Sequence, residues 1–372
     1  MRAASPPSAN PPSAKTARPG AGPAPACGKQ DTEPRGRADV SRYVIIGAGA
    51  IGAPVAAQLR STGVGVVLVA RGAHRTAIAT DGLRYVRPEG ERRIKLPVAG
   101  SAAEVDLTVG DVLVLATKTQ DTEAVLAEWS WRPVTGGTTA AESLPLISLQ
   151  NGLDNERVAL RRFARTSGAA VQMPSSYLRP GEVVAPGDPV VGAFYLGGYP
   201  GGLDPDAEVW ATDLRRSGFA VRLVDDLPRW KAGKLINNVV NPVDALYAGH
   251  ERFDDLAEAL QAEARRVVEK AGFDPADLSA DPDMRVGLSA DLMDRYGGSS
   301  TRQSLGKGAG ATEADFLNGE IVLLGRLHGV PTPLNAAMQA AVARAARDGV
   351  PPGGGDPALP DALLGTTEGT GR

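Results

Sequence analysis

The feature that most constrains the fold is a glycine-rich hexapeptide between two apolar runs. Residues 43–46 read Tyr-Val-Ile-Ile, and GAGAIG follows at once from Gly47 to Gly52. A helix-like segment then runs to Gly63, and a second apolar run, VGVVLVAR, ends at Arg71. Such runs are typical of strands that are buried on both faces of a parallel sheet. The order strand, glycine turn, helix, strand is the context that makes a GxGxxG pattern informative.

The three glycines of this pattern have separate roles in a dinucleotide site. Gly47 allows the tight turn, Gly49 lets the backbone approach a pyrophosphate, and Gly52 lets the helix pack close to the strand. The helix N-terminus would add N–H groups and partial positive charge for the phosphates. The sequence therefore predicts a cofactor site formed by Gly47, Ala48, Gly49, Ala50, Ile51 and Gly52. The alternative is a glycine-rich turn in another kind of α/β protein.

The end of the second strand indicates which dinucleotide is bound. A site that prefers NAD usually has Asp or Glu there to accept the ribose hydroxyls. This chain has Arg71, with Arg75 close behind. A guanidinium can bind a 2′-phosphate through two hydrogen bonds, so we predict NADP(H). The alternative for Arg71 is a solvated loop charge.

Two further strand ends carry polar residues that point to the same crevice. Lys118 follows the apolar run that starts at Asp111, and Gln150 and Asn151 follow LPLISL. Open α/β sheets bind ligands at the carboxyl ends of their strands. We therefore expect Lys118 and Asn151 to line the same crevice, although Lys118 can be an ordinary loop lysine and Asn-Gly is also a common turn.

From Asp225 the pattern changes from strands to helices. Lys234, Asn238 and Asn241 stand at i, i+4 and i+7 among apolar neighbours, so a continuous helix would present all three on one face. Burial lowers the pKa of a lysine, which suits it to give up a proton near neutral pH. Pro242 cannot donate to the carbonyl of Asn238, so the helix should bend or end there. The alternative is a surface lysine and two asparagines at a broken helix.

Several other polar residues stay open between a structural and a functional role. Ser299 and Ser300 can cap a helix, and Thr312-Glu313 can begin the next one. A glutamate beside a functional lysine would instead be its natural hydrogen-bond partner. The three histidines form no metal-like pattern, so we predict neither a metal site nor a hydride transfer that depends on histidine.

The composition excludes several other classes of protein. The formal net charge is −3 without a dominant basic block, which disfavours nucleic acid and membranes as partners. The single cysteine, Cys27, rules out a disulfide framework and fits a cytoplasmic location. Residues 1–41 and 350–372 are rich in Pro, Gly and small residues, and we expect both to be disordered tails.

Taken together, these segments resemble those of the ketopantoate reductases (2-dehydropantoate 2-reductases). GAGAIG, TKTQDTEA, LQNGLDNE, RWKAGKLINNVVNPVDAL, GSSTRQSL and ATEADFLNGEIVLLGRLHGVPTP occur in that order, across nearly all of residues 42–345. The match is loosest over residues 171–202. The resemblance implies an α/β fold, with a Rossmann-type NADP-binding domain over residues 42–224 and a helical substrate domain over residues 225–349.

The resemblance also implies roles for individual residues. Lys234 matches the proton donor, and Glu313 matches an acid that supports the lysine and the cofactor. Lys118 and Asn151 match residues around the nicotinamide and the substrate. Asn238, Asn241 and Ser300 match substrate-binding positions.

The implied reaction is the NADPH-dependent reduction of a small 2-keto acid, 2-dehydropantoate, to pantoate in pantothenate and coenzyme A biosynthesis. Two alternatives stay open: a related NADP-dependent hydroxy-acid dehydrogenase with another substrate, and a non-catalytic NADP-binding redox sensor. The apolar helices of residues 312–349 are also compatible with a homodimer.

Overall fold

The computed structural model describes residues 42–368 of the 372-residue chain, and side chains up to residue 365. The disordered tail that we expect for residues 1–41, with Cys27, lies outside the described residues, as do residues 369–372. Within the described range, residues 42–223 contain nearly all the strands, and residues 227–368 contain mainly helices and the loops that join them.

The predicted strand–turn–helix–strand unit forms the start of the fold. Strand β1 (Arg42–Ile46) leads through the glycine turn into helix α1 (Gly52–Ser61), and β2 (Val66–Val69) returns parallel to β1. The two strands pair in register, Ile45 with Leu68 and Ile46 with Val69. Both strands are almost completely buried, as their apolar composition predicts.

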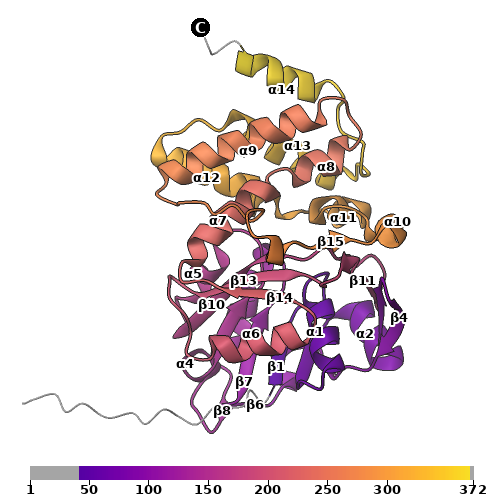
Figure 1. The fold of residues 1–372 in the computed structure, drawn as a ribbon, viewed down its shortest axis with the longest axis vertical. Helices are drawn as coiled ribbons and strands as arrows, with labels where there is room; N and C mark the ends of the chain where they lie inside the picture. The colour runs from indigo at the N-terminus through magenta and orange to yellow at the C-terminus, as the bar shows by residue number, and fades with distance from the viewer. Residues whose placement is uncertain (1–41, 369–372) are drawn as a thin grey trace, which may run out of the picture. The chain divides into compact units, whose positions relative to one another are not determined.

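This unit belongs to an eight-stranded sheet with the order β14-β13-β10-β9-β7-β1-β2-β5. Figure 1 labels β1, β7, β10, β13 and β14 of this sheet. The strands from β10 to β5 in this order are parallel, whereas β13 pairs antiparallel to β10 and parallel to β14. The remaining strands of the sheet are β5 (Val98–Ala99), β7 (Asp111–Leu115), β9 (Pro145–Ser148), β10 (Arg165–Gln172), β13 (Ala193–Gly198) and β14 (Ala220–Leu223). The carboxyl ends of β1, β7, β9 and β10 therefore meet at one edge of the sheet.

Helices cover both faces of the sheet, because alternate residues of each strand point to opposite sides. Tyr43 and Ile45 pack in one core cluster with α1 and α6 (Ala207–Arg216). Val44 and Ile46 pack in another with α3 (Thr122–Trp129) and α4 (Ala140–Ser143). This arrangement is the doubly covered α/β sheet that the sequence predicts.

The stretch after α2 (Gly72–Asp81) forms a hairpin of strands β3 (Leu83–Arg87) and β4 (Gly90–Ile94), and β11 (Glu182–Val184) pairs with β3. The other short elements are β6 (Leu107–Thr108), β8 (Val134–Thr135), β12 (Gly187–Asp188), β15 (Gly287–Leu288) and α5 (Asn155–Ala159). The 3₁₀ turns are η1 (Ala102–Glu104), η2 (Thr119–Asp121), η3 (Pro282–Met284), η4 (Ala290–Leu292) and η5 (Glu313–Phe316).

The helical region begins with α7 (Leu227–Asn238), which Asp226 caps by accepting a hydrogen bond from the N–H of Arg229. The helix ends at Asn238, and α8 (Asn241–Tyr247) starts a new one with Pro242 in its first turn. The predicted break at Pro242 is therefore confirmed. The region continues with α9 (Phe253–Lys270), α10 (Met293–Tyr296), α11 (Ser300–Gly306), α12 (Asn318–His328) and α13 (Pro333–Asp348), and four of these helices with α7 share a core cluster.

The prediction of a disordered tail from residue 350 is wrong for residues 350–368. The chain there ends in α14 (Leu359–Glu368), and Leu364 is buried in the helical core. The N–H of Gly353 also donates to the carbonyl of Ala245 at 2.8 Å. A few apolar contacts thus order this segment. In a sequence rich in Pro and Gly, the few apolar residues that make these contacts do not form a recognisable pattern. Residues 42–368 lie within one compact unit, and the division into domains at residue 224 stays a prediction.

Candidate active site

A cavity of about 910 Å³ lies where the carboxyl edge of the sheet faces the helical region. Most of the site residues predicted from the sequence line it: Gly47, Gly49, Ala50, Ile51, Lys118, Asn151, Lys234, Asn238, Asn241, Ser300 and Glu313. These residues come from the two halves of the chain, so the fold brings together segments far apart in sequence. The predicted residues outside the lining are Ala48, Gly52 and Arg71.

The glycine turn has the shape that a dinucleotide requires. Gly47 has a φ of +111°, and a Cβ there would lie 2.7 Å from the carbonyl oxygen of Ala116. A Cβ on Gly52 would overlap the carbonyl oxygen of Gly47, so the helix can pack this closely only on glycine. A Cβ on Gly49 would meet nothing within 4 Å, and Gly49 lines the cavity. The open backbone at Gly49 therefore fits the approach of a pyrophosphate.

Ala48 does not line the cavity, and its carbonyl is hydrogen-bonded to a buried histidine. Nε2 of His74 lies 2.8 Å from the carbonyl oxygen of Ala48, and the N–H of Gly181 donates to Nδ1 of His74 at 2.8 Å. Because Nδ1 accepts, Nε2 carries the proton and donates to Ala48. Burial lowers the pKa of His74, which agrees with a neutral ring. His74 thus supports the turn, a role that the sequence pattern did not indicate.

Arg71 lies at the end of β2, as predicted, but its side chain pairs with a glutamate of the protein. The guanidinium is 71% exposed and pairs with Glu128 at 3.0 Å. The residue at this strand end is thus an arginine, not the Asp or Glu that a site preferring NAD usually has there. Arg75, in the first turns of α2, pairs with Glu104 at 2.5 Å.

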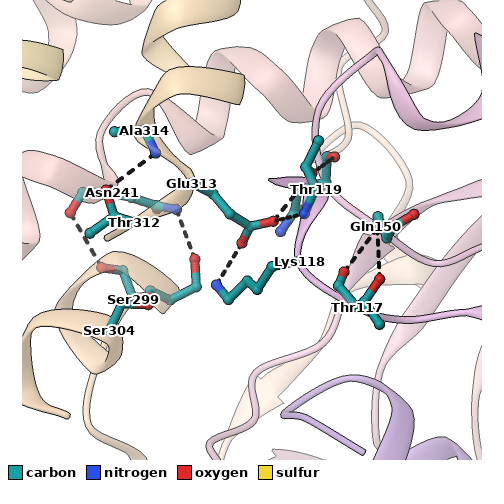
Figure 2. A network of polar contacts seen from close by, with 12 residues as sticks. Thr117, Lys118, Thr119, Gln150, Asn241, Ser299, Ser304, Thr312, Glu313 and Ala314 are labelled. Atoms are coloured by element: carbon teal, nitrogen blue, oxygen red, sulfur yellow. Dashed lines mark hydrogen bonds and ion pairs between the residues drawn. The ribbon is translucent and has the colours of Figure 1, made fainter. Parts of the chain in front are cut away.

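Lys118 and Glu313 form a direct link between the sheet edge and the helical region (Figure 2). Lys118 Nζ donates to Glu313 Oε2 at 2.6 Å, and the backbone N–H of Thr119 donates to Glu313 Oε1 at 3.0 Å. The hydroxyl of Thr119 adds a third hydrogen bond at 3.2 Å. Glu313 is buried in the 3₁₀ turn η5, capped by Thr312. Glu313 is therefore the partner of Lys118; no hydrogen bond or ion pair joins it to Lys234.

The strand end after β9 is fixed by its own polar network. Gln150 Nε2 donates to the carbonyl of Thr117 and to the hydroxyl of Thr122, both at 2.9 Å (Figure 2 shows the bonds to Thr117). The carbonyl of Asn151 accepts from Asn155 Nδ2 at 2.8 Å. These bonds hold the backbone around Asn151, whose side chain makes no hydrogen bond within residues 42–368 and is free to meet a ligand in the cavity.

Lys234 and Asn238 lie one turn apart on α7, and Asn241 starts α8. All three line the cavity although the helix breaks between them. Asn238 Oδ1 is buried and accepts no hydrogen bond within the described part of the chain. Asn241 Nδ2 donates to the hydroxyl of Ser300 at 3.4 Å, the first residue of α11. A buried acceptor without a donor costs free energy, so Asn238 suits a ligand that donates one.

Among Lys234, Asn238 and Asn241, only Lys234 carries a titratable group. Burial lowers its pKa to about 8. Among residues 42–368 it has neither a hydrogen bond nor an ion pair. A lysine in these surroundings can release its proton near neutral pH, as a general acid must.

The two serines at the start of α11 both line the cavity. Ser299 Oγ accepts from the N–H of Arg302 at 3.3 Å and caps the helix. The hydroxyl of Ser300 accepts from Asn241. Ser299 therefore has the capping role that the sequence left open, and Ser300 is the serine in contact with another predicted site residue.

A buried ion pair behind the cavity was missed by the sequence analysis. Lys231, one turn before Lys234, pairs with Glu156 and donates to the carbonyl of Gln150 at 3.0 Å. Lys231 and Glu156 are 4% and 0% exposed. Nothing in the local pattern of either residue indicates its partner, because 75 residues separate them.

Two other classes of site are not found in the described part of the chain. Within residues 42–368 no group of three or more His, Cys, Asp or Glu side chains is placed to hold a metal ion. None of the helices described is long and apolar enough to cross a membrane.

The sheet, its glycine turn and the cavity at the strand ends define a class of protein: dinucleotide-binding proteins with a Rossmann-type sheet. Two family models match this chain, "Ketopantoate reductase PanE/ApbA" over residues 43–200 and its C-terminal counterpart over residues 229–346. The chain belongs to the ketopantoate reductase family.

Curated relatives and solved structures agree with this assignment. The 2-dehydropantoate 2-reductase of Archaeoglobus fulgidus is 27% identical over 80% of this chain and 96% of its own length. The enzyme of that name from Mesorhizobium japonicum is 29% identical over 82% and 98%. A PanE/ApbA family ketopantoate reductase from Ralstonia eutropha superposes with a TM-score of 0.66 at 25% identity, covering 82% of this chain and 99% of that one. D-mandelate dehydrogenase, solved with NADH and anilino(oxo)acetate, shares the fold with a TM-score of 0.65 at 19% identity over 82% and 98%.

Proposed function

We propose that this chain reduces 2-dehydropantoate to pantoate with NADPH, and that Lys234 supplies the proton. The observation that carries the proposal is the state of Lys234, an ammonium that lines the cavity, has no partner among the described residues and has a pKa of about 8. The relatives named 2-dehydropantoate 2-reductase support 2-dehydropantoate as the substrate.

The residues of the cavity divide into two groups in this proposal. The turn from Gly47 to Gly52 receives the pyrophosphate, with Lys118, Asn151 and Glu313 around the nicotinamide half of the cofactor. Bound NADPH would supply the hydride that the keto carbon accepts. The cofactor is NADPH rather than NADH because Arg71, and no carboxylate, stands at the end of β2.

The second group holds the keto acid. Ser300 and Asn241 already lie in hydrogen-bond contact and can donate to the substrate carboxylate. The free Oδ1 of Asn238 accepts from the substrate hydroxyl. Lys234 then donates its proton to the carbonyl oxygen as that oxygen gains negative charge. Acid catalysis of this kind contributes roughly 10²–10⁴-fold to the rate.

A second candidate is a related dehydrogenase that acts on a 2-keto acid with an apolar side chain. The observation that favours it is an apolar part of the cavity wall, with Val286, Leu288 and Met293. Leu288 and Met293 are each 45% exposed. Such a wall would bury an alkyl or aryl group more favourably than the hydroxymethyl group of 2-dehydropantoate.

One assay separates these candidates. The protein is incubated with NADPH and 2-dehydropantoate, or with 2-keto acids that carry alkyl or phenyl groups, and loss of the reduced nicotinamide absorbance is followed. The highest kcat/KM with 2-dehydropantoate supports the proposal, and a higher value with an apolar keto acid supports the second candidate. Lys234→Ala should lower kcat by roughly 10²-fold or more and leave NADPH binding intact. Turnover near that of the wild type would refute the role of Lys234.

A further inference from the structure

The cavity contains a third lysine, Lys307, to which none of the roles above applies. It follows the last turn of α11 and lines the cavity. Its ammonium lies 4.2 Å from the centroid of the Tyr177 ring, a cation–π contact. No carboxylate within residues 42–368 forms an ion pair with it, whereas Lys118 is paired with Glu313. Although Lys307 remains accessible, partial burial and the nearby charge of Lys118 lower its pKa to about 8.

Two aromatic rings connect this ammonium to the glycine turn. The Tyr177 ring packs against the His74 ring with centroids 4.2 Å apart, and His74 donates to the carbonyl of Ala48. Lys307 is therefore held on the side of the cavity where the turn lies. The turn itself offers N–H groups and a helix dipole but no charged side chain.

The position of Lys307 separates it from the substrate residues. Lys307 follows Ser300 by seven residues, and a helix rises 1.5 Å per residue, so about 10 Å along the α11 axis lie between their Cα atoms. This backbone separation disfavours a keto acid carboxylate bound at Ser300 and Asn241 as the partner of Lys307. An anion that reaches from the glycine turn toward Lys307 is the better partner.

We propose that Lys307 binds the pyrophosphate of the dinucleotide from the helical side of the cavity, with the ring of Tyr177 holding its ammonium in place. A pyrophosphate carries two negative charges, and Lys307 supplies the side-chain cation that the glycine turn lacks. The proposal rests on the proposed function only in requiring a dinucleotide in this cavity, not on which keto acid is reduced.

The test measures cofactor binding without keto acid. Dissociation constants are determined for NADPH, NADH, ADP-ribose and adenosine 2′-monophosphate with the wild type, Lys307→Met, Lys307→Arg and a control, Lys95→Met, in which an exposed lysine outside the cavity is changed. Lys307→Met should weaken the three ligands that contain a pyrophosphate about tenfold and leave adenosine 2′-monophosphate unchanged. Lys307→Arg should restore most of the affinity, and Lys95→Met should have no effect.

Tyr177 provides a second, independent variant pair. Tyr177→Phe keeps the ring under the ammonium and should bind like the wild type, whereas Tyr177→Leu should lose affinity for the same three ligands. Thermal unfolding of each variant shows whether it is folded.

Three outcomes would overturn the proposal. Loss confined to NADPH and adenosine 2′-monophosphate would place Lys307 at the 2′-phosphate. Unchanged binding with a raised KM for the keto acid would place it at the substrate. Equal binding of all ligands by folded Lys307→Met would leave it without a role. Because the dissociation constants are measured without keto acid, they test the pyrophosphate role even if the chain reduces a different substrate.

Discussion

Lys118 Nζ and Glu313 Oε2 lie 2.6 Å apart, although 195 residues separate them in the sequence. Lys118 belongs to the strand end after β7, and Glu313 to the 3₁₀ turn before α12. The pair therefore connects the cofactor-binding sheet to the helical region at the edge of the cavity. Since Glu313 also accepts two bonds from Thr119, its carboxylate fixes the position of both the lysine and the backbone beside it.

The first prediction concerns this carboxylate. Glu313→Gln keeps the shape but removes the charge that holds Lys118, so we expect kcat/KM to fall roughly tenfold. The effect should be mainly on the KM for the cofactor. Asp121→Asn is the matched control, because Asp121 also lines the cavity edge but is exposed and has no side-chain partner in the described residues. Equal effects of the two variants in steady-state kinetics would show that only the overall charge of the cavity matters.

The second prediction is the pH dependence of the reduction. Lys234 must be protonated to donate, and its pKa is about 8. We therefore expect log kcat/KM to be flat below pH 8 and to fall with a slope close to −1 above it. Lys307 has a similar pKa, so the profile is repeated with Lys307→Arg, whose side chain does not titrate in this range. If the inflection disappears in Lys307→Arg, it does not belong to Lys234.

How far the sequence predicts this fold depends on whether the relevant contacts are local. The turn from Gly47 to Gly52, the spacing of Lys234 and Asn238, and the break at Pro242 are local, and the structure has each of them where we predicted it. The prediction of a disordered tail is wrong for residues 350–368 because the burial of Leu364 depends on helices far away in the sequence.

The same reasoning explains the rest of the candidate site. Sequence patterns place Lys118 and Arg71 at strand ends, but their partners Glu313 and Glu128 are set by tertiary packing. The resemblance implies that Glu313 supports Lys234, whereas the structure pairs Glu313 with Lys118. The ion pair of Lys231 and Glu156 was missed because a lysine in an amphipathic helix normally faces solvent.

The third prediction is that Lys234 reduces the stability of the protein. Its folded-state pKa of about 8 is below the 10.5 of an ordinary lysine, so folding favours the neutral form and the charged form is penalised. Lys234→Met keeps the apolar stem and removes the ammonium, and should stabilise the protein by about 1–3 kcal/mol at pH 7. This gain in unfolding free energy should reach its full value below pH 8 and disappear as the pH rises to 10.5. Urea unfolding measures it, and Lys95→Met serves as the exposed control; a destabilised Lys234→Met would contradict the prediction.

The fourth prediction concerns the buried pair of Lys231 and Glu156. Lys231→Met leaves the fully buried carboxylate of Glu156 without a counterion and should cost about 3–5 kcal/mol in unfolding free energy. The double variant Lys231→Met with Glu156→Leu removes both charges and should recover most of this loss. Urea unfolding of the two single variants and the double variant gives the coupling energy. Additive effects would mean that the two side chains stabilise the fold independently.

The last prediction tests the choice of cofactor at Arg71. The ion pair of Arg71 with Glu128 is exposed, and such pairs contribute only about 0.2–1 kcal/mol, so a 2′-phosphate can take the place of Glu128 at little cost. Arg71→Ala should therefore raise the dissociation constant of NADPH about tenfold and leave that of NADH unchanged. Glu128→Gln keeps an acceptor for the N–H of Ala102 and should bind NADPH at least as well as the wild type. Fluorescence titration of the reduced nicotinamide measures both constants, and an equal loss for NADPH and NADH in Arg71→Ala would remove Arg71 from the 2′-phosphate site.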